Sequence, residues 1–423
     1  MSVDPNLLDD LQWRGLVAHS TDLDALSAAL QESSVRFYVG FDPTAPSLHM
    51  GNLVQLTTAR RLQDAGHTPY LLVGGATGMI GDPRDSGERT LNSLETVQEW
   101  TEGVRRQIEP FLAFSGDNGA TMVNNYDWTE GLSVIDFLRD VGKHFPVNRM
   151  LARETVKRRL ESGISYTEFS YVLLQSMDFL TLYREHGVTL QFGGSDQWGN
   201  LTGGAELIRR AESGSAHAFA TPLVTKADGT KYGKTEGGAL WLDPAMMSPY
   251  AFHQFWLNVE DEKVGEMLRI FTFLPRADIE ALEARHEEKP FLREAQKTLA
   301  DEVTTFVHGP EETEQAKAAA AALFGGGDLM GLQPQTLAAA LSEAGSTVVE
   351  RGEALPSVID LLLASGLATS KGDARRTVSE GGAYVNNVRV EDPDAAVGQH
   401  DLIGGAWLVL RRGKKKFAGI EIR

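Results

Sequence analysis

Residues 36–75 contain a strand, a helix and a second strand in succession, and this order fixes the type of sheet. Residues 36–41 (RFYVGF) have the composition of a strand and end at Asp42-Pro43, a turn signal. Residues 48–66 predict a helix that stops at Gly66, and residues 69–75 (PYLLVGG) predict the next strand. Such a unit requires parallel strands with a right-handed crossover, and its ligands bind beyond the carboxyl ends of the strands. The expected fold class is therefore α/β, with a Rossmann-like parallel sheet.

The turn after the first strand carries groups that suit a phosphate. Thr44, His49 and Gly51 lie where a helix is expected to begin at a strand's end. Free backbone N–H groups and the positive end of the helix would favour an anion there, and Gly51 would let a flat ring approach closely. The alternative is a turn with Ser47 as the helix cap and a chance histidine.

A second basic motif lies about 180 residues downstream, at 231–235 (KYGKT). Lys231 and Lys234 bracket a small residue in a glycine-rich stretch, as in a mobile loop that closes over phosphates. A solvated basic turn is the alternative. The presence of the first motif favours the phosphate interpretation.

A polar stripe interrupts an otherwise apolar helical segment at 168–187. Tyr171, Gln175 and Asp178 stand at i, i+4 and i+7, which places them on one helix face. Buried without partners these groups would be costly, so the face meets either water or a polar ligand. Residues 193–200 (GGSDQWGN) then follow a strand and suit a second binding segment at a strand end.

The length of 423 residues requires more than one core. From about Ser248 the pattern is helical, a glycine run at 325–327 indicates a flexible joint, and mixed helix and strand patterns follow Pro356. We expect an α/β domain at 1–246, an α-helical domain at 247–328, a linker at 329–355 and a small α+β domain at 356–423.

The net charge of −18 argues at first against a nucleic-acid partner. The charge is uneven, however, since residues 356–423 hold 10 Lys and Arg against 8 Asp and Glu. Basic clusters occur at 411–416 (RRGKKK) and at 143–159, although each could be a solvated face. The absence of cysteine excludes disulfides, thiolate metal sites and a cysteine nucleophile. An acidic first segment and the lack of a long apolar stretch predict a cytoplasmic protein without membrane segments.

Taken together, these motifs resemble those of class I aminoacyl-tRNA synthetases, specifically the bacterial tyrosyl type. HMGN at 49–52 is similar to the family's HIGH signature, and KYGKT at 231–235 to its KMSKS signature. The resemblance extends over nearly the whole chain, through strings that include GFDPTAPSLH, GGATGMIGDP, NNYDW, GISYTEFSY and GGSDQWGN. It implies activation of L-tyrosine with ATP and Mg²⁺, followed by transfer to tRNA(Tyr), in a homodimer. It also implies that 1–246 is the catalytic domain and 356–423 an RNA-binding domain.

The resemblance also implies residue roles. Tyr38 and Asp178 match the family's pair that binds the phenol hydroxyl of the substrate. The residues that match its other contacts to the substrate tyrosine are Asp82, Tyr171, Gln175 and Gln197. ATP contacts match Asp42, Gly51, Asn52, Asp196, Lys234 and Thr235, and catalysis falls to Thr44, His49, Lys231 and Lys234. Candidate tRNA contacts are Lys371, Arg375, Arg376, Arg411, Arg412, Lys414, Lys415 and Lys416, with an exposed helix face as the alternative for Arg375 and Arg376. No resident metal site is expected.

The chain departs from the family pattern at three places. Asn52 replaces the second histidine of HIGH, and Gly233 and Thr235 alter KMSKS. The mobile-loop lysine after GDP is missing, and the sequence does not decide whether Arg84 or Arg89 compensates for it. Three other functions compete: a tryptophanyl-tRNA synthetase, a small-molecule nucleotidyltransferase, and a catalytically inactive RNA-binding protein. Tyr38 with Asp178 fits a phenol better than an indole, which disfavours the tryptophanyl enzyme. The C-terminal basic segment disfavours the nucleotidyltransferase. The presence of both the phosphate-binding residues and the polar pocket residues disfavours the inactive RNA-binding protein.

Overall fold

The structure is a computed structural model, and it describes residues 3–83, 87, 91–226, 229–230, 232, 234–235, 238–325, 327–352, 355–413 and 416–423. The packing divides the chain into two units. The first is Met1–Met246 with Glu260–Ala295, and the second is Met247–Val259 with Gln296–Arg423.

A mainly parallel sheet forms the centre of the first unit. Among the described residues it has six strands in the order β1-β6-β5-β2-β3-β4, and only β1 runs antiparallel to its neighbour. The strands are β1 (His19–Ser20), β2 (Arg36–Phe41), β3 (Thr68–Val73), β4 (Thr121–Asn124), β5 (Leu190–Gly194) and β6 (His217–Thr221). The chain crosses the sheet between β4 and β5, so β2 and β5 meet at the point where the strand order reverses.

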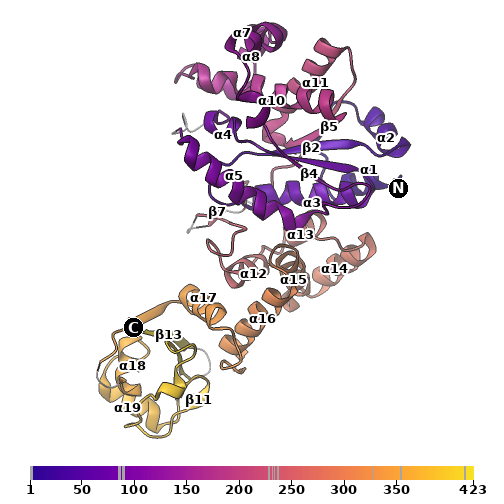
Figure 1. Ribbon diagram of the computed structural model, residues 1–423. Coiled ribbons are helices and arrows are strands. Elements are labelled where there is room, and N and C mark those ends of the chain that lie inside the picture. The colour runs from indigo at the N-terminus through magenta and orange to yellow at the C-terminus, as the bar shows by residue number, and fades with distance from the viewer. Residues whose placement is uncertain are drawn as a thin grey trace. The chain divides into compact units, whose positions relative to one another are not determined.

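Helices cover both faces of this sheet, with α10 and α11 on one side and α3 and α5 on the other (Figure 1). Burial of both faces explains why β2 and β3 are almost continuously apolar rather than alternating. The helices of this region are α1 (Leu7–Trp13), α2 (Leu23–Glu32), α3 (Met50–Asp64), α4 (Thr77–Ile80), α5 (Leu94–Ile108), α10 (Tyr166–His186) and α11 (Trp198–Glu212), with the 3-10 turns η1 (Glu109–Phe111) and η4 (Ser195–Gln197).

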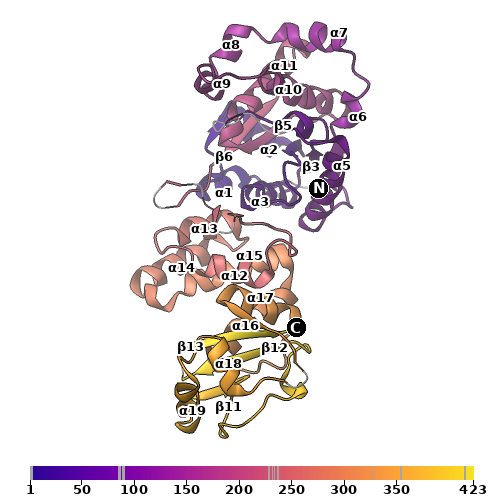
Figure 2. The same ribbon diagram turned by 90° about the vertical axis from the view of Figure 1, so that its left-hand side faces the viewer.

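Short helical turns fill the segment between β4 and α10, and Figures 1 and 2 both place α7 and α8 at the outer edge of this unit. They are α6 (Tyr126–Thr129), α7 (Val134–Asp136), η2 (Phe137–Val141), η3 (Gly142–His144), α8 (Val147–Leu151) and α9 (Glu154–Arg159). A small hairpin, β7 (Lys234–Thr235) with β8 (Gly238–Ala239), follows β6, and the unit is completed by α13 (Val264–Phe271), α14 (Arg276–Glu288) and η5 (Pro290–Leu292).

The second unit combines helices with a small sheet. Its helices are α12 (Pro249–Leu257), most of α15 (Glu294–His308), α16 (Pro310–Gly325), α17 (Pro334–Ala344), α18 (Val358–Ala364), α19 (Lys371–Ser379) and η6 (Gln399–Asp401). In the described residues the sheet has the order β11-β10-β12-β13-β9, formed by β9 (Ser346–Val349), β10 (Ala383–Val385), β11 (Val388–Arg389), β12 (Trp407–Arg412) and β13 (Lys416–Ile422).

The expected βαβ unit and α/β class are confirmed, since β2, α3 and β3 form it with parallel pairing. The four-part division expected from the sequence stays a prediction. Within it, the segment 329–355 contains α17 and β9, and β9 pairs with β13. The glycine run at 325–327 includes Gly326, which lies outside the described residues.

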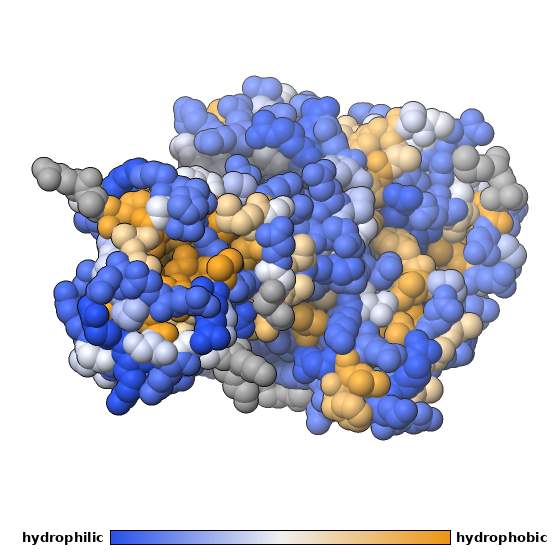
Figure 3. All heavy atoms as spheres, turned by 90° about the horizontal axis from the view of Figure 1, so that it is seen from below, coloured by the Kyte–Doolittle hydropathy of each residue, from blue (hydrophilic) through white to orange (hydrophobic). Residues whose placement is uncertain are grey.

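Hydrophilic side chains predominate on the face drawn in Figure 3, with apolar side chains gathered in separate areas. Of the helices in the described part of the chain, none combines the length and the apolar character that a bilayer span requires.

Candidate active site

The candidate site lies at the carboxyl ends of the central parallel strands. Asp42 follows β2, Gly74 to Thr77 follow β3, and Asn125 follows β4. Gly194 is the last residue of β5, and Ser195 to Gln197 follow it as η4. Helix α10 passes over the same face of β2 and β3 and contributes to a shared core with Tyr38 and Tyr70. Asp42 and residues 193–200 lie at the carboxyl ends of β2 and β5, and Asp82 follows α4. That substrates bind at this edge stays a prediction.

A tyrosine and a carboxylate meet at the most deeply buried end of the site. Tyr38 is 1% exposed and its ring lies 5.3 Å from that of Phe179. Its hydroxyl has no hydrogen-bond partner among the described residues. Burial, together with the charges of Asp178 and Asp42, raises the pKa of the Tyr38 phenol well above its ordinary value. Tyr38 therefore presents an intact hydroxyl that can still donate or accept a hydrogen bond.

Two neutral donors hold the Asp178 carboxylate in place. Trp128 Nε1 donates to Oδ1 at 2.9 Å, and Asn125 Nδ2 donates to Oδ2 at 3.0 Å. Asp178 is 2% exposed, and burial raises its pKa to about 7, while these two hydrogen bonds oppose the shift. Each carboxylate oxygen retains a second acceptor site, so Asp178 can accept a further hydrogen bond from a ligand.

A chain of hydrogen bonds links this end of the site to Asp42. Tyr171 Oη donates to Asp42 Oδ2 at 2.6 Å, and Thr77 Oγ1 donates to Asp42 Oδ1 at 2.7 Å. The Thr77 hydroxyl also accepts from Asn125 Nδ2 at 2.9 Å, so Asn125 contacts both ends of the network. A side chain at Gly74 would collide with Asp42 and Thr77, because a Cβ there would overlap their oxygens.

A second polar group surrounds Asp82. Gln197 Nε2 and Asn200 Nδ2 donate to its carboxylate at 2.8 and 3.1 Å. Burial raises the Asp82 pKa, and these hydrogen bonds act against the rise. Nearby on α10, Gln175 Oε1 is buried and has no hydrogen-bond partner in the described part of the chain. The polar stripe of α10 thus points into the protein, and the alternative in which it faces water is wrong for Tyr171 and Asp178.

His49 caps helix α3 at the opposite end of the site. Its ring Nδ1 accepts from the Gly51 backbone N–H at 3.1 Å, and the backbone N–H of His49 donates to Asn52 Oδ1 at 3.0 Å. With Nδ1 accepting, the neutral ring carries its hydrogen on Nε2 and can donate outward. The alternative in which Ser47 caps the helix is wrong, because Ser47 Oγ instead donates to Leu48 O and Gln107 Oε1.

The expectation of free backbone N–H groups at this helix start is also wrong. The capping box uses the Gly51 N–H, and the Met50 N–H donates to Leu240 O at 3.0 Å. Side chains such as His49 and Thr44 are therefore the groups that this turn offers to an anion. Thr44, His49 and Gly51 are exposed, and Asn52 is half-buried.

Backbone pairing joins the start of α3 to residues 240–242, which follow the lysine motif at 231–235. Leu242 N donates to Leu48 O at 2.9 Å, and His49 forms an antiparallel bridge with Trp241. The β7–β8 hairpin, which contains the backbone of Lys234 and Thr235, leads directly into this segment. Lys231 and Gly233 lie outside the described residues, as do Arg84 and Arg89. Asp196 is exposed on η4 at the end of β5.

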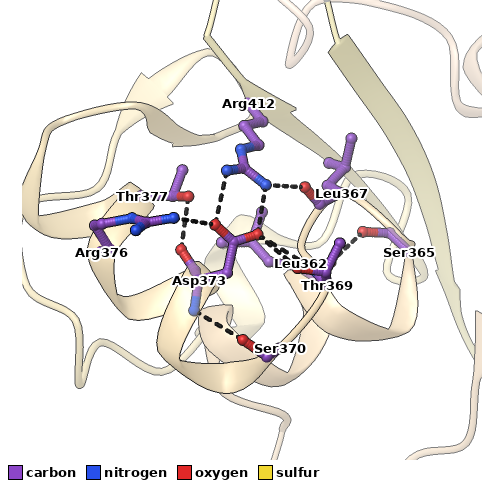
Figure 4. Close-up of polar contacts among 9 residues, drawn as sticks. All are labelled: Leu362, Ser365, Leu367, Thr369, Ser370, Asp373, Arg376, Thr377 and Arg412. Atoms are coloured by element: carbon purple, nitrogen blue, oxygen red, sulfur yellow. Dashed lines mark hydrogen bonds and ion pairs between the residues drawn. The ribbon is translucent and has the colours of Figure 1, made fainter.

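The described C-terminal candidate residues lie in the second unit, on α19, β12 and the start of β13, and are together called the basic surface. Arg412 donates from Nη1 and Nη2 to the two carboxylate oxygens of Asp373 at 2.8 and 2.9 Å, and also to Leu367 O (Figure 4). Arg376 Nη2 reaches the same carboxylate at 3.1 Å. These hydrogen bonds hold the pKa of Asp373 far below its ordinary value. Arg412 thus joins β12 to the start of α19.

Of the other described candidates, Lys371, Arg375 and Lys416 are exposed and Arg411 is half-buried. Lys371 and Arg375 form exposed ion pairs with Asp360 and Asp394 at 2.8 and 2.6 Å. Arg411 Nη1 donates to Asn387 Oδ1 at 2.9 Å, and Lys416 is exposed at the start of β13. Lys414 and Lys415 lie outside the described residues.

Sequence reasoning assigned no role to four residues that shape the site: Gly74, Thr77, Asn125 and Trp128. Asn125 and Trp128 belong to the string NNYDW, whose likeness to the family was noted. Their position directly after β4, a strand parallel to β3, is the signal that would have placed them at the same sheet edge.

Comparisons with known proteins agree with this geometry. Residues 30–325 match the model of the family "tRNA synthetases class I (W and Y)". Residues 337–420 match the model described as "Tyrosine--tRNA ligase SYY-like C-terminal domain".

Similar proteins cover almost the full length of the chain. It is 62% identical over 420 residues to a tyrosine–tRNA ligase of Streptomyces coelicolor, with 99% of each chain covered. It is 61% identical over 421 residues to that of Streptomyces griseus, with the same coverage. Among solved structures, it is similar to a C-terminally truncated mitochondrial tyrosyl-tRNA synthetase of Aspergillus nidulans, with a TM-score of 0.68, 28% identity, and 75% of this chain and 94% of that chain covered.

Proposed function

This chain belongs to the class I tRNA synthetases of the tryptophan and tyrosine group and ligates tyrosine to tRNA, and from its geometry we propose which residues hold each substrate. The enzyme activates L-tyrosine with ATP to tyrosyl-adenylate and pyrophosphate. It then transfers the tyrosyl group to the 3′-terminal adenosine of tRNA(Tyr).

In our proposal the tyrosine side chain occupies the buried end of the site. The phenol hydroxyl donates to Asp178 and exchanges a hydrogen bond with Tyr38. Two observations support this arrangement: the Tyr38 hydroxyl is buried without a partner among the described residues, and Asp178 is fixed by two donors. Buried polar groups of this kind penalise a ligand that lacks the hydroxyl. Tyrosyl-tRNA synthetases are the established example, at about 10⁵-fold against phenylalanine, and that figure is theirs rather than a result of this geometry.

The amino-acid backbone of the substrate lies nearer the sheet edge. We assign its ammonium group to Tyr171, Gln175 and Asp82. The unpartnered Gln175 Oε1 and the Asp82 carboxylate supply acceptors for a cation. Gln197, which is held against Asp82, lies near the substrate carboxylate.

Activation needs no general base, because the tyrosine carboxylate is ionised near pH 7 and attacks the α-phosphate directly. The bond from the α-phosphate to pyrophosphate breaks as the new bond forms, so the protein's task is to position the reactants and stabilise charge on the leaving oxygens. We assign that task to Thr44, His49, Lys231 and Lys234. Each donor that acts mainly in the transition state contributes about 3–4 kcal/mol.

ATP enters as its magnesium complex, so the metal is part of the substrate. We assign the nucleotide contacts to Asp42, Gly51, Asn52, Asp196, Lys234 and Thr235. The pairing of residues 48–50 with 240–242 supports this assignment, because it brings the lysine-containing hairpin to the start of α3. Asn52 serves first as the capping-box partner of His49, so the asparagine that replaces the family's second histidine helps to orient the first.

The C-terminal basic surface is the proposed tRNA contact. Lys371, Arg375, Arg376 and Arg411, with Lys414, Lys415 and Lys416, supply phosphate contacts. Arg412 contributes its charge while it also holds α19 in place.

We also propose that the enzyme works in the cytoplasm as a homodimer. The support is a group of exposed apolar side chains in the segment between β4 and α10. They are Val134, Ile135, Leu138, Val147, Leu151, Leu160 and Tyr166. Monomers rarely expose apolar side chains in such density, and a second copy of this face would cover them.

The proposed specificity rests on two groups: the buried Tyr38 hydroxyl, which has no hydrogen-bond partner among the described residues, and the Asp178 carboxylate, which two donors fix. The test is ATP–pyrophosphate exchange with tyrosine, phenylalanine and tryptophan, followed by aminoacylation of tRNA(Tyr). Exchange with tyrosine alone is expected, and Lys234→Ala should slow turnover with tyrosine affinity roughly kept. Lys263→Ala, which removes a lysine paired with Glu266, is the control. Equal exchange with tryptophan or phenylalanine would contradict the assignment.

A further inference from the structure

The turn between β10 and β11 reaches from the C-terminal module (residues 355–423) to the helices before it. Asn387 Nδ2 donates to Ala322 O at 3.0 Å and to Gly327 O at 2.8 Å. Ala322 belongs to the last turn of α16, where carbonyls lack partners within the helix. A side chain 65 residues further along the chain therefore caps α16.

The same asparagine also holds one of the proposed tRNA contacts. Arg411 Nη1 donates to Asn387 Oδ1 at 2.9 Å. Asn387 has a φ of 65°, a backbone conformation in which asparagine is tolerated and glycine is unstrained. Its amide thus connects Arg411, one of the residues of the basic surface, with the end of α16.

Close packing supports this connection. Ile403 and Val409 of the module share a core with α12, α16 and α17, and the rings of Phe324 and Phe417 lie 5.4 Å apart. Two glycines of the module permit the approach to α17. A Cβ at Gly404 would lie 2.6 Å from Pro334 Cβ, and one at Gly419 would lie 2.8 Å from Leu341 Cβ. Neither position could carry a side chain without a shift of the backbone or of α17.

We infer that Asn387 is a positioning residue for tRNA binding: it locks the C-terminal module onto α16 so that the basic surface is presented by one rigid body with the helices. This inference rests on the proposed role of that surface in binding tRNA. A module already held in place loses less conformational freedom on binding than one that is ordered by the tRNA. The lock therefore acts on tRNA affinity and leaves the activation of tyrosine untouched.

The test compares two neighbouring asparagines in the full-length enzyme. Asn387→Gly removes the bonds to α16 and to Arg411 while the backbone conformation remains allowed. Asn386→Gly is the matched control, because Asn386 also has a positive φ and its side chain bonds, among the described residues, to Asp401 O and Val409 N within the module.

Docking is measured directly by spin labels. Since the chain has no cysteine, Ala318→Cys on α16 and Ala364→Cys on α18, both exposed alanines, give unique label sites. We expect a single narrow distance distribution in the parent and in Asn386→Gly, and a broader one in Asn387→Gly. The KM for tRNA should rise about tenfold in Asn387→Gly with kcat and pyrophosphate exchange unchanged, the range expected when one or two hydrogen bonds are lost.

The outcomes separate the lock from the proposed tRNA surface. Equal distance distributions in all three proteins would overturn the lock, as would a broadened distribution in Asn387→Gly with the parent's KM for tRNA. If Asn387→Gly fails to fold, Gly419→Ala provides a second route to undocking through the clash with Leu341, and an unchanged distance distribution in that variant would likewise count against the lock. Loss of tRNA binding in the parent, or no effect of Lys371→Ala on its affinity, would instead overturn the tRNA surface.

Discussion

Asp178→Asn is the substitution that most sharply probes how the pocket selects tyrosine. The amide keeps the shape of the carboxylate but carries two donors in place of one oxygen. Both oxygens of Asp178 already accept hydrogen bonds, from Trp128 and Asn125. Whichever way the new amide is oriented, its NH₂ group must therefore face an N–H donor, and it offers the substrate phenol a neutral acceptor at best.

The magnitude follows from these contacts. A hydrogen bond to a charged group is stronger than a neutral one by about 1–1.5 kcal/mol, and a donor left unsatisfied in a buried site costs about 1–3 kcal/mol. A net loss of about 2 kcal/mol for the bound tyrosine corresponds to a roughly 30-fold fall in kcat/KM. Phenylalanine makes no hydrogen bond to Asp178, so its kcat/KM should stay level or rise.

The assay is pyrophosphate exchange with each amino acid, expressed as the ratio of the two kcat/KM values. Asp127→Asn is the matched control, because Asp127 is exposed and lies three residues from the end of β4. The reasoning is refuted if the tyrosine-to-phenylalanine ratio of Asp178→Asn stays within twofold of the parent while the control also leaves it unchanged.

Four further predictions follow from other parts of the structure. First, burial raises the Asp178 pKa to about 7 in the folded protein, so the parent protein loses stability as the pH rises from about 4 to 7. Asp178→Asn lacks this titrating group. Its free energy of unfolding minus that of the parent, measured by urea denaturation, should therefore grow over this range and level off above it. Secondly, the methyl group of Gly74→Ala collides with Asp42 and Thr77. The substitution should therefore lower kcat/KM for tyrosine at least tenfold in pyrophosphate exchange and destabilise the protein by about 1–3 kcal/mol. Unchanged kinetics would show that activity does not depend on the position of the Asp42 carboxylate. Thirdly, Ile135 is 69% exposed in the single chain, and Ile135→Asp should give a monomer in light scattering coupled to gel filtration. Phe114 is an exposed apolar residue elsewhere in the same unit, and Phe114→Asp should remain a dimer. A dimer that survives Ile135→Asp would place the interface elsewhere. Fourthly, Arg412→Ala should lower the melting temperature, because it leaves Asp373 with fewer partners. Lys371→Ala should keep the melting temperature and reduce the slope of log tRNA affinity against log salt concentration by about one. The opposite pattern would reverse the roles of these two residues.

Local patterns were sufficient to predict the fold class and the polar stripe. The βαβ unit at 36–75 follows from strand composition and helix signals, and the spacing of Tyr171, Gln175 and Asp178 follows from the helical period. Both depend on residues that lie close together in sequence, where periodicity is informative.

Contacts between distant segments could not be predicted in this way. The hydrogen bonds from Asn125 and Trp128 to Asp178 span about 50 residues, and the capping role of His49 depends on how its ring turns toward Gly51 rather than on residue type. The same limit applies to 329–355, where α17 packs in a core with residues from three other segments and β9 pairs with β13. Propensity gives no information on which distant partner a side chain will meet.

The central claim is that one cleft at the sheet edge holds the phenol of tyrosine at its buried end and the phosphates of ATP at the start of α3. A crystal structure of the enzyme with a non-hydrolysable tyrosyl-adenylate analogue tests this most directly. The account predicts the phenol oxygen within hydrogen-bond distance of Asp178 and Tyr38, and the phosphate mimic beside His49 and Thr44. An analogue bound with its ring away from Asp178, or bound outside this cleft, would contradict it.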